Sequence, residues 1–288
     1  MKSSHLLSLL STLLLPLTAC SVAPSYSAPT ASAATQAPSQ ASAAFPTLSA
    51  ADKAKIGKKI WQNESGGTVS GLTAWNVGEE FPSLGIGHFI WYPKNYRGPY
   101  TESFPTFIRY AQQRGVKTIP AWVLKSPSRP WPNRNSFNAA KNGAHLTSLR
   151  NFLAANVELQ TNFILAKSQA ALGKILTTAP PAQRATIRNN YAKVATTSNG
   201  AYALIDYVNF KGEGINPKER YKGQGWGLLQ VLANMNPSVT AGQPAAKEFS
   251  TSAKRMLDRR IKNSTSTRGE TRWREGWHNR CDTYARQL

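Results

Sequence analysis

One glutamate stands where a buried acid could work. Ile56, Ile60 and Glu64 are spaced four residues apart in a segment that predicts a helix, so they share one face. A carboxyl group at the end of an apolar stripe, beside the negative end of a helix dipole, is harder to ionise. We therefore expect a raised pKa for Glu64, which suits a general acid. The alternative is that Glu64 faces solvent just before a helix stop at Gly66 and Gly67.

The segment after this helix predicts a hairpin or small sheet. Residues 68–92 place Thr, Val, Trp, Phe and Ile between glycines and prolines. Gly85 and Gly87 are two apart, so on a strand they would lie on the same face. Two missing side chains there would let a ligand or another backbone approach closely.

The order of these features resembles the phage-type lysozymes over about residues 49–92. In that family a glutamate ends the first helix, and a hairpin follows that closes with Thr two residues before G-I-G-H. Here the closing sequence is Ser83, Leu84, Gly85, Ile86, Gly87, His88. The resemblance implies a mostly α fold with a small β-sheet (α+β). It also implies that Glu64 is the general acid, that Ser83 helps to hold the attacking water, and that Gly85, Gly87 and His88 lie beside the substrate.

The second catalytic carboxylate of that family has no counterpart at the expected position. The family places an Asp in the hairpin, where this chain has Val77. Glu79 and Glu80 lie closer to Ser83 in the same hairpin and could substitute, with Glu80 slightly preferred. The catalytic set predicted is therefore Glu64, Glu80 and Ser83, and hydrolysis and transglycosylation both stay open.

A second similarity lies far downstream. The segment GWGLLQ, 225–230, is similar to the G-L-M-Q segment of soluble lytic transglycosylases, which share the lysozyme-like core. The alternative is an ordinary buried helix in which Leu228, Leu229 and Leu232 pack. Glu213, between two glycines, is a rival acid.

Cleavage of a glycosidic bond needs an acid that protonates the leaving oxygen and a group that stabilises or intercepts the oxocarbenium-like centre. Aromatic side chains favour sugar binding, and Trp75 is the predicted platform, with Trp91, Tyr92 and Trp122 as further candidates.

The N-terminal residues predict export. Lys2 precedes an apolar run that ends in LTAC, residues 17–20, which resembles a bacterial lipobox. We expect a signal peptide over 1–19, lipidation of Cys20, a disordered Ala/Ser/Pro tether over 20–47 and a lysozyme-like domain over 48–288. A plain secretory signal is the alternative. Because Ser21 is not Asp, the anchor predicts the outer membrane, facing the periplasm.

The net charge and the remaining reactive residues restrict the classes of partner and cofactor that we expect. A net charge of +21 favours polyanions. Outside the cytoplasm these are wall and membrane components, so we expect peptidoglycan strands and a membrane contact through the lipid anchor, no nucleic acid, and a monomer. Cys281 is predicted to be a buried filler, with a catalytic thiol as the alternative. No cofactor and no metal site are predicted, because the Cys and His residues show no ligand spacing.

Besides the first helix, to about residue 63, helices are predicted over 104–114, 146–176, 181–195, 199–210, 224–235, 245–262 and 268–286, and a surface loop over 126–133. Together these features predict a peptidoglycan-cleaving lipoprotein of the cell envelope. The alternative is a non-catalytic wall-binding lipoprotein that keeps the fold and lacks the second carboxylate.

Overall fold

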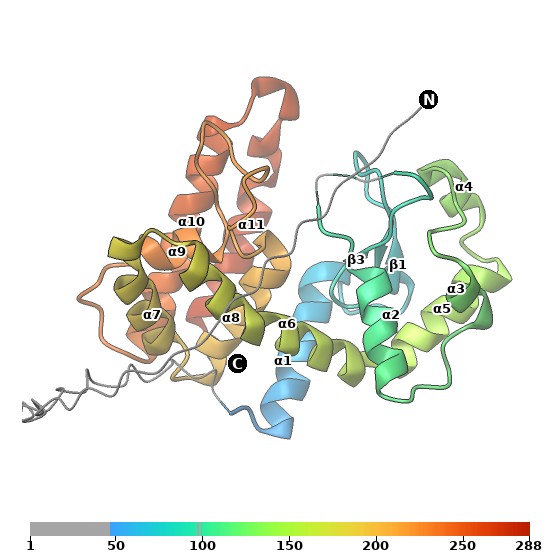
Figure 1. The fold of residues 1–288 in the computed structure, drawn as a ribbon, viewed down its shortest axis with the longest axis horizontal. Helices are drawn as coiled ribbons and strands as arrows, with labels where there is room; N and C mark the ends of the chain where they lie inside the picture. Colours follow the sequence, from blue (N-terminus) through green and yellow to red (C-terminus); the bar gives the residue numbers. More distant parts are fainter. Residues whose placement is uncertain (1–46, 97, 99) are drawn as a thin grey trace, which may run out of the picture. The chain divides into compact units, whose positions relative to one another are not determined.

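The computed structural model describes residues 47–288 except 97 and 99 (Figure 1). It is mostly helical with one small antiparallel sheet, which confirms the predicted fold class. The predicted signal peptide, Cys20 and nearly all of the predicted tether lie outside the described residues. None of the described helices combines the length and the apolar character needed to cross a bilayer.

The first helix and the sheet come from residues 50–90. Helix α1 spans Ala50–Ser65, and a short 3-10 turn, η1, spans Ser70–Leu72. The sheet has the order β1-β2-β3, with β1 at Thr73–Ala74, β2 at Ser83–Leu84 and β3 at Phe89–Ile90. Both pairs are antiparallel, and Ser83 is the partner of Ala74 on one side and of Ile90 on the other.

The rest of the described chain is helical, and the elements follow in chain order. They are α2 (Phe104–Gln113), α3 (Ala121–Lys125), α4 (Arg134–Ala139), α5 (Ala144–Ala155), α6 (Val157–Thr178), α7 (Pro181–Val194), α8 (Ser198–Lys211), α9 (Leu228–Ala233), α10 (Gln243–Asn263), η2 (Ser266–Arg268), η3 (Glu270–Trp273), α11 (Arg274–Asp282) and η4 (Thr283–Ala285).

Three of the predicted helix boundaries are wrong. The helix expected over 146–176 breaks at Asn156, whose φ of −125° and ψ of 40° are not helical, so α5 and α6 are separate. The helix expected from 224 begins only at Leu228, because Tyr221 and Gln224 pair in a tight turn before it. The segment 268–286 is divided between 3-10 turns and α11. Two short helices, α3 and α4, were not predicted.

Both ends of α1 are capped. The Ser49 hydroxyl accepts a hydrogen bond from the Asp52 amide at 3.0 Å, which satisfies one free donor of the first turn. At the other end Gly66 adopts a left-handed conformation with φ of 64°, and its amide donates to the Gln62 carbonyl. Glu64 therefore lies in the last turn of α1.

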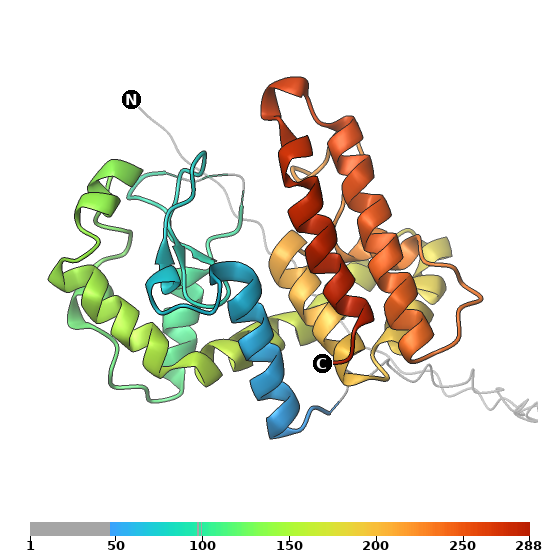
Figure 2. The ribbon, with the colours of Figure 1, turned by 180° about the vertical axis from the view of Figure 1, so that it is seen from behind.

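Helices α6 and α8 connect the packing of the described residues. Helix α6 contacts α1, α2 and α5 as well as α7 and α8. Helix α8 is enclosed by α6, α7, α9 and α10, and every residue from Asn199 to Val208 is buried. Figure 2 shows α10 and α11 side by side, in orange and red. Since α8 is buried on all sides, any charge within it must be paired inside the protein.

The turn between β2 and β3 is fastened to α6 by one buried glutamine. Oε1 of Gln160 accepts a hydrogen bond from the Ile86 amide at 3.0 Å, and its Nε2 donates to the Leu153 carbonyl at 2.7 Å. Gly85 has φ of 71°, and a Cβ atom there would collide with Oε1 of Gln160. The glycine therefore allows the contact that positions the turn before His88.

The prediction that residues 126–133 form a surface loop is wrong in part. The segment has no helix or strand, but Arg129 and Trp131 within it are buried. The Arg129 guanidinium lies 4.1 Å from the Trp75 ring centroid, and Trp131 packs edge-on against Phe137. The loop therefore covers the hairpin side of the core.

Two glycine substitutions test the role of Gly85. Gly115 has the same φ of 71°, and a Cβ atom there would meet nothing within 4 Å. We expect Gly115→Ala to lower the free energy of unfolding by about 1–2 kcal/mol through backbone strain alone. Gly85→Ala should cost a further 1–3 kcal/mol or so, because it also displaces Gln160. Chemical denaturation measures both values, and equal losses would contradict the role given to the Gln160 contact.

Candidate functional site

Glu64 is held by three side chains from distant parts of the chain. Its Oε1 accepts hydrogen bonds from Nη2 of Arg280 at 2.6 Å and from Nδ2 of Asn209 at 3.0 Å. Its Oε2 lies 3.1 Å from Nδ1 of His88. The side chain is 10% exposed, so Glu64 is neither fully buried nor turned out to solvent. Elements α1, α8, α11 and the β2–β3 turn therefore meet at this carboxylate.

Arg280 is itself fixed by a second, fully buried carboxylate. Its Nε and Nη2 donate to Asp206 at 2.8 Å each, a two-pronged pair typical of arginine and carboxylate. The Tyr284 hydroxyl donates to Asp206 at 2.6 Å, and Nδ2 of Asn63 lies 3.5 Å from it. Asp206 is therefore paired on every side, which offsets the cost of burying its charge.

These contacts shift the pKa of Glu64 in the direction opposite to the one expected from sequence. Burial opposes its ionisation, but the charges of Arg280 and His88 and the hydrogen bonds from Arg280 and Asn209 outweigh burial, so the pKa of Glu64 lies below its ordinary value. The expectation of a raised pKa is wrong, because an apolar helix face alone does not show which charges arrive from elsewhere. In the free protein Glu64 is an anion rather than a stored acid.

His88 lies in the turn that Gln160 fastens. Its φ of 48° is in the left-handed region, which is uncommon for a residue with a side chain. Nδ1 faces Glu64, while Nε2 is buried and has no hydrogen-bond partner among the described residues. A strained histidine with a free ring nitrogen next to a carboxylate is typical of a functional site rather than of packing alone. The predicted site residue His88 is therefore brought to Glu64.

The hairpin carboxyl group that lies beside Ser83 is Glu79. Its Oε2 accepts hydrogen bonds from Oγ of Ser83 at 3.3 Å and from Nδ2 of Asn76 at 3.1 Å. Burial raises the pKa of Glu79, and the negative charge of Glu64 adds to the increase against the opposing effects of His88, Asn76 and Ser83. The two carboxyl groups are therefore electrostatically coupled.

Glu80, the preferred hairpin partner from sequence, is exposed, and only its backbone carbonyl is bonded, by Arg129 at 3.2 Å. The preference for Glu80 is corrected to Glu79, because the loop between β1 and β2 places the carboxyl group of Glu79 within hydrogen-bond distance of Ser83.

The predicted substrate-contacting glycines are packed inside the protein. Gly85 lies against Gln160, and a Cβ atom at Gly87 would collide with Phe89 and Ile164. Both belong to the turn after β2 rather than to a strand. Their role is corrected from ligand approach to close packing of the turn on α6.

Three of the four predicted aromatic platforms, namely Trp75, Trp91 and Tyr92, are not open to a ligand. Trp75 is 5% exposed, its Nε1 donates to the Glu79 carbonyl at 2.6 Å, and Arg129 lies against its ring. Trp91 and Tyr92 are buried, and Trp122 stacks on His145. The role of Trp75 is corrected from sugar binding to support of the hairpin that carries Glu79.

Two rival reactive residues lie elsewhere. Glu213 pairs with Nζ of Lys174 at 2.8 Å. Cys281 is a buried free thiol whose pKa is raised to about 12 by burial, so it is unsuited to act as a nucleophile. Within the described ranges, no group of three or more His, Cys, Asp or Glu side chains is arranged to hold a metal ion.

Three residues of the site were missed from sequence: Asp206, Asn209 and Arg280. Asp206 stands in the apolar run AYALIDYVNF, and Asn209 is three residues later on the same helix face. A charge within an apolar helix indicates a buried partner, so that signal was present. Arg280 has no comparable signal, because it is 216 residues from Glu64.

Comparison with known proteins adds no relative: no family model, no curated protein and no solved structure matches the chain. The site is therefore interpreted from its own residues.

The ion pair of Glu64 predicts a pH-dependent contribution to stability. Because the folded-state pKa is lowered, this contribution is present above the unfolded-state value of about 4.3 and is lost as pH falls through the folded-state value. Glu64→Gln should therefore lower the free energy of unfolding at pH 7 by about 1–3 kcal/mol and reduce its fall between pH 5 and pH 3.

Glu80→Gln is the matched control, since Glu80 is exposed, and it should leave both quantities near those of the wild type. Urea denaturation at several pH values measures them. A Glu64→Gln protein as stable as wild type, with the same acid slope, would show that the ion pair contributes nothing.

Proposed function

We propose that this protein cleaves glycosidic bonds of peptidoglycan with Glu64 and Glu79 as its two carboxyl groups. The observation that carries the proposal is the opposite displacement of their pKa values in one coupled site, lowered for Glu64 and raised for Glu79. Glycosidases need one carboxyl group that holds a proton and one that carries a charge, and neighbouring groups with separated pKa values provide both.

The free structure supports a definite division of roles. Glu79 keeps its proton to a higher pH, so it protonates the leaving glycosidic oxygen. Glu64, kept ionised by Arg280, stabilises or intercepts the positive carbon that forms as the bond breaks. Ser83 donates to Glu79 and orients its carboxyl group. These roles differ from the resemblance, which gives proton donation to Glu64.

The substrate and its location are proposed from charge and from the N-terminal sequence. A net charge of +21 favours an anionic polymer, and peptidoglycan carries carboxylates. Lipidation at Cys20 would tether the enzyme to the cell envelope, on the periplasmic side of an outer membrane, where it meets this polymer.

Three carboxyl substitutions test the proposal. Glu79→Gln removes the proton donor and should lower the rate of sugar release from purified peptidoglycan by about 10²- to 10⁴-fold. Glu64→Gln should lower it at least as much, because the developing positive charge loses its anion. Glu80→Gln is the matched control one residue away and should keep a rate close to that of wild type. The wild-type rate should have an acid limb set by Glu64 and an alkaline limb set by Glu79.

Glu213→Gln tests whether the rival acid Glu213 takes part in cleavage. We expect this variant to release sugar at a rate near that of wild type. An inactive Glu64→Gln protein beside a fully active Glu79→Gln protein would contradict the role of Glu79. An inactive Glu213→Gln protein beside active variants of the other two would move the active centre to the loop before α9.

One observation favours the second candidate, a non-catalytic wall-binding protein. Both oxygens of Glu64 are engaged by protein groups, Oε1 by Arg280 and Asn209 and Oε2 by His88. A carboxylate with both oxygens bonded in this way stabilises the fold whether or not it takes part in catalysis. If wild-type protein co-sediments with peptidoglycan of several species and releases no fragments, this second function replaces the first.

A further inference from the structure

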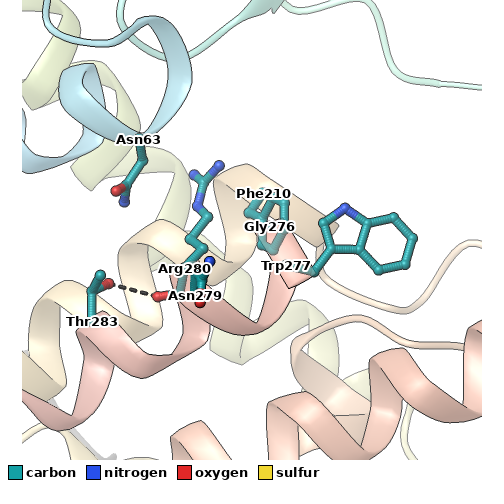
Figure 3. A pocket seen from close by; sticks show the side chains of 7 residues that line it. All are labelled: Asn63, Phe210, Gly276, Trp277, Asn279, Arg280 and Thr283. Carbon is teal, nitrogen blue, oxygen red and sulfur yellow. Dashed lines mark hydrogen bonds between the residues drawn. The ribbon is translucent and has the colours of Figure 1, made fainter. Parts of the chain in front are cut away.

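A pocket of about 370 Å³ lies directly beside the Glu64 site. It is lined by residues from α1, α8, α11 and η4 (Figure 3): Asn63, Phe210, Gly276, Trp277, Asn279, Arg280 and Thr283. Arg280 belongs to both places, because its Nη2 bonds Glu64 at 2.6 Å while it also lines the pocket. A ligand in this pocket would therefore touch the group that keeps Glu64 ionised.

The lining has the chemistry of a sugar-binding site. Phe210 and Trp277 supply aromatic surface, Asn63 and Asn279 supply amides, and Thr283 supplies a hydroxyl. Ligand pockets of about 300–1,000 Å³ commonly combine apolar walls with a few polar groups that set orientation. Trp277 is only half-buried, so here, unlike at Trp75, an aromatic side chain borders open space.

The charge balance beside the pocket is incomplete. The guanidinium of Arg280 is already matched by Asp206 and Glu64. Lys211, at the end of α8, is different: its Nζ lies 3.6 Å from the Trp277 ring centroid and 4.0 Å from that of Phe210. Among the described residues it has no ion-pair or hydrogen-bond partner, although it is not exposed. Lys211 does not itself line the pocket, but its amine rests on two rings that do, so an anionic group of a ligand beside those rings would meet an amine that has no anion of its own.

The surroundings make this ammonium receptive to an anion. Burial and the positive charges of Arg260 and Arg280 lower the pKa of Lys211, against the weaker opposing effects of Cys281 and Glu270. A carboxylate placed beside Nζ would favour its charged form and gain a charge-assisted hydrogen bond. An uncharged sugar would gain neither.

We propose that this pocket is a subsite of the glycan-cleaving site and that Lys211 recognises a carboxylate carried by the sugar residue that occupies it. The inference rests on the proposed function and deepens it by naming the substrate feature that is read. In peptidoglycan such a carboxylate has two sources, the lactyl group of a muramoyl residue or the stem peptide attached to it.

Binding of three small sugars tests the inference without any cleavage. N-acetylglucosamine has no carboxylate, N-acetylmuramic acid has a free lactyl carboxylate, and N-acetylmuramoyl-L-alanyl-D-isoglutamine carries its carboxylate on the peptide. Each is titrated into ¹⁵N-labelled protein while the indole N–H signal of Trp277, assigned with Trp277→Phe, is followed. We expect at least one of the two acids to bind about tenfold more tightly than N-acetylglucosamine. Whichever acid is preferred identifies the source.

Lysine variants then assign the preference. Lys211→Met keeps a long apolar side chain against the two rings and should bind all three sugars equally, whereas Lys211→Arg should keep the preference for an acid. Lys218→Met is the matched control, because it removes a lysine from an exposed loop position, whereas the amine over the Phe210 and Trp277 rings is that of Lys211. It should behave as wild type.

Equal affinity of wild-type protein for the three sugars would overturn the inference, as would the absence of any shift at Trp277 or an unchanged acid preference in Lys211→Met. If Lys211→Met does not fold, the affinities of wild-type protein for the three sugars still test the inference. Acid-selective binding by a protein that releases nothing from peptidoglycan would refute the proposed function alone. Cleavage without acid preference would refute the subsite alone.

Discussion

The structure depends on one arginine that lies between two carboxylates. Arg280 pairs with the fully buried Asp206 on one side and with Glu64 on the other. The pairs connect α11 to α8 and to the end of α1, three elements that are far apart in the sequence. Buried charges are costly unless they are fully bonded, so the hydrogen bonds from Tyr284 to Asp206 and from Asn209 to Glu64 are part of the same unit.

The charge state of this unit determines what the rest of the site can do. Because Arg280 and its neighbours keep Glu64 ionised, a negative charge is present near the hairpin, and it helps to raise the pKa of Glu79. Loss of Arg280 would therefore change the pKa values of both Glu64 and Glu79. The supporting contacts serve this geometry: Gln160 positions the turn before His88, and Arg129 covers the tryptophan whose indole bonds the Glu79 carbonyl.

Local features of the site were predictable from sequence, and long-range ones were not. The cap at Ser49, the stop at Gly66 and the small sheet follow from residue types at short spacing, so Glu64 could be placed at a helix end. Its pKa could not, because the decisive charge comes from Arg280. The distinction between Glu79 and Glu80 also needs the hairpin geometry, since the two are adjacent and chemically identical. The glycines at 85 and 87 indicated close approach, but only the structure shows that Gln160 and Ile164 of α6 and Phe89 of β3 make it.

The most direct test of the account is the order in which the two carboxyl groups titrate. Side-chain carboxyl ¹³C signals of wild-type protein, assigned with Glu64→Gln and Glu79→Gln, can be followed by NMR from pH 2 to pH 8. The account predicts a pKa below the ordinary value of about 4.3 for Glu64 and above it for Glu79. It also predicts that the pKa of Glu79 falls in Glu64→Gln. A pKa for Glu64 above that of Glu79 would contradict the account.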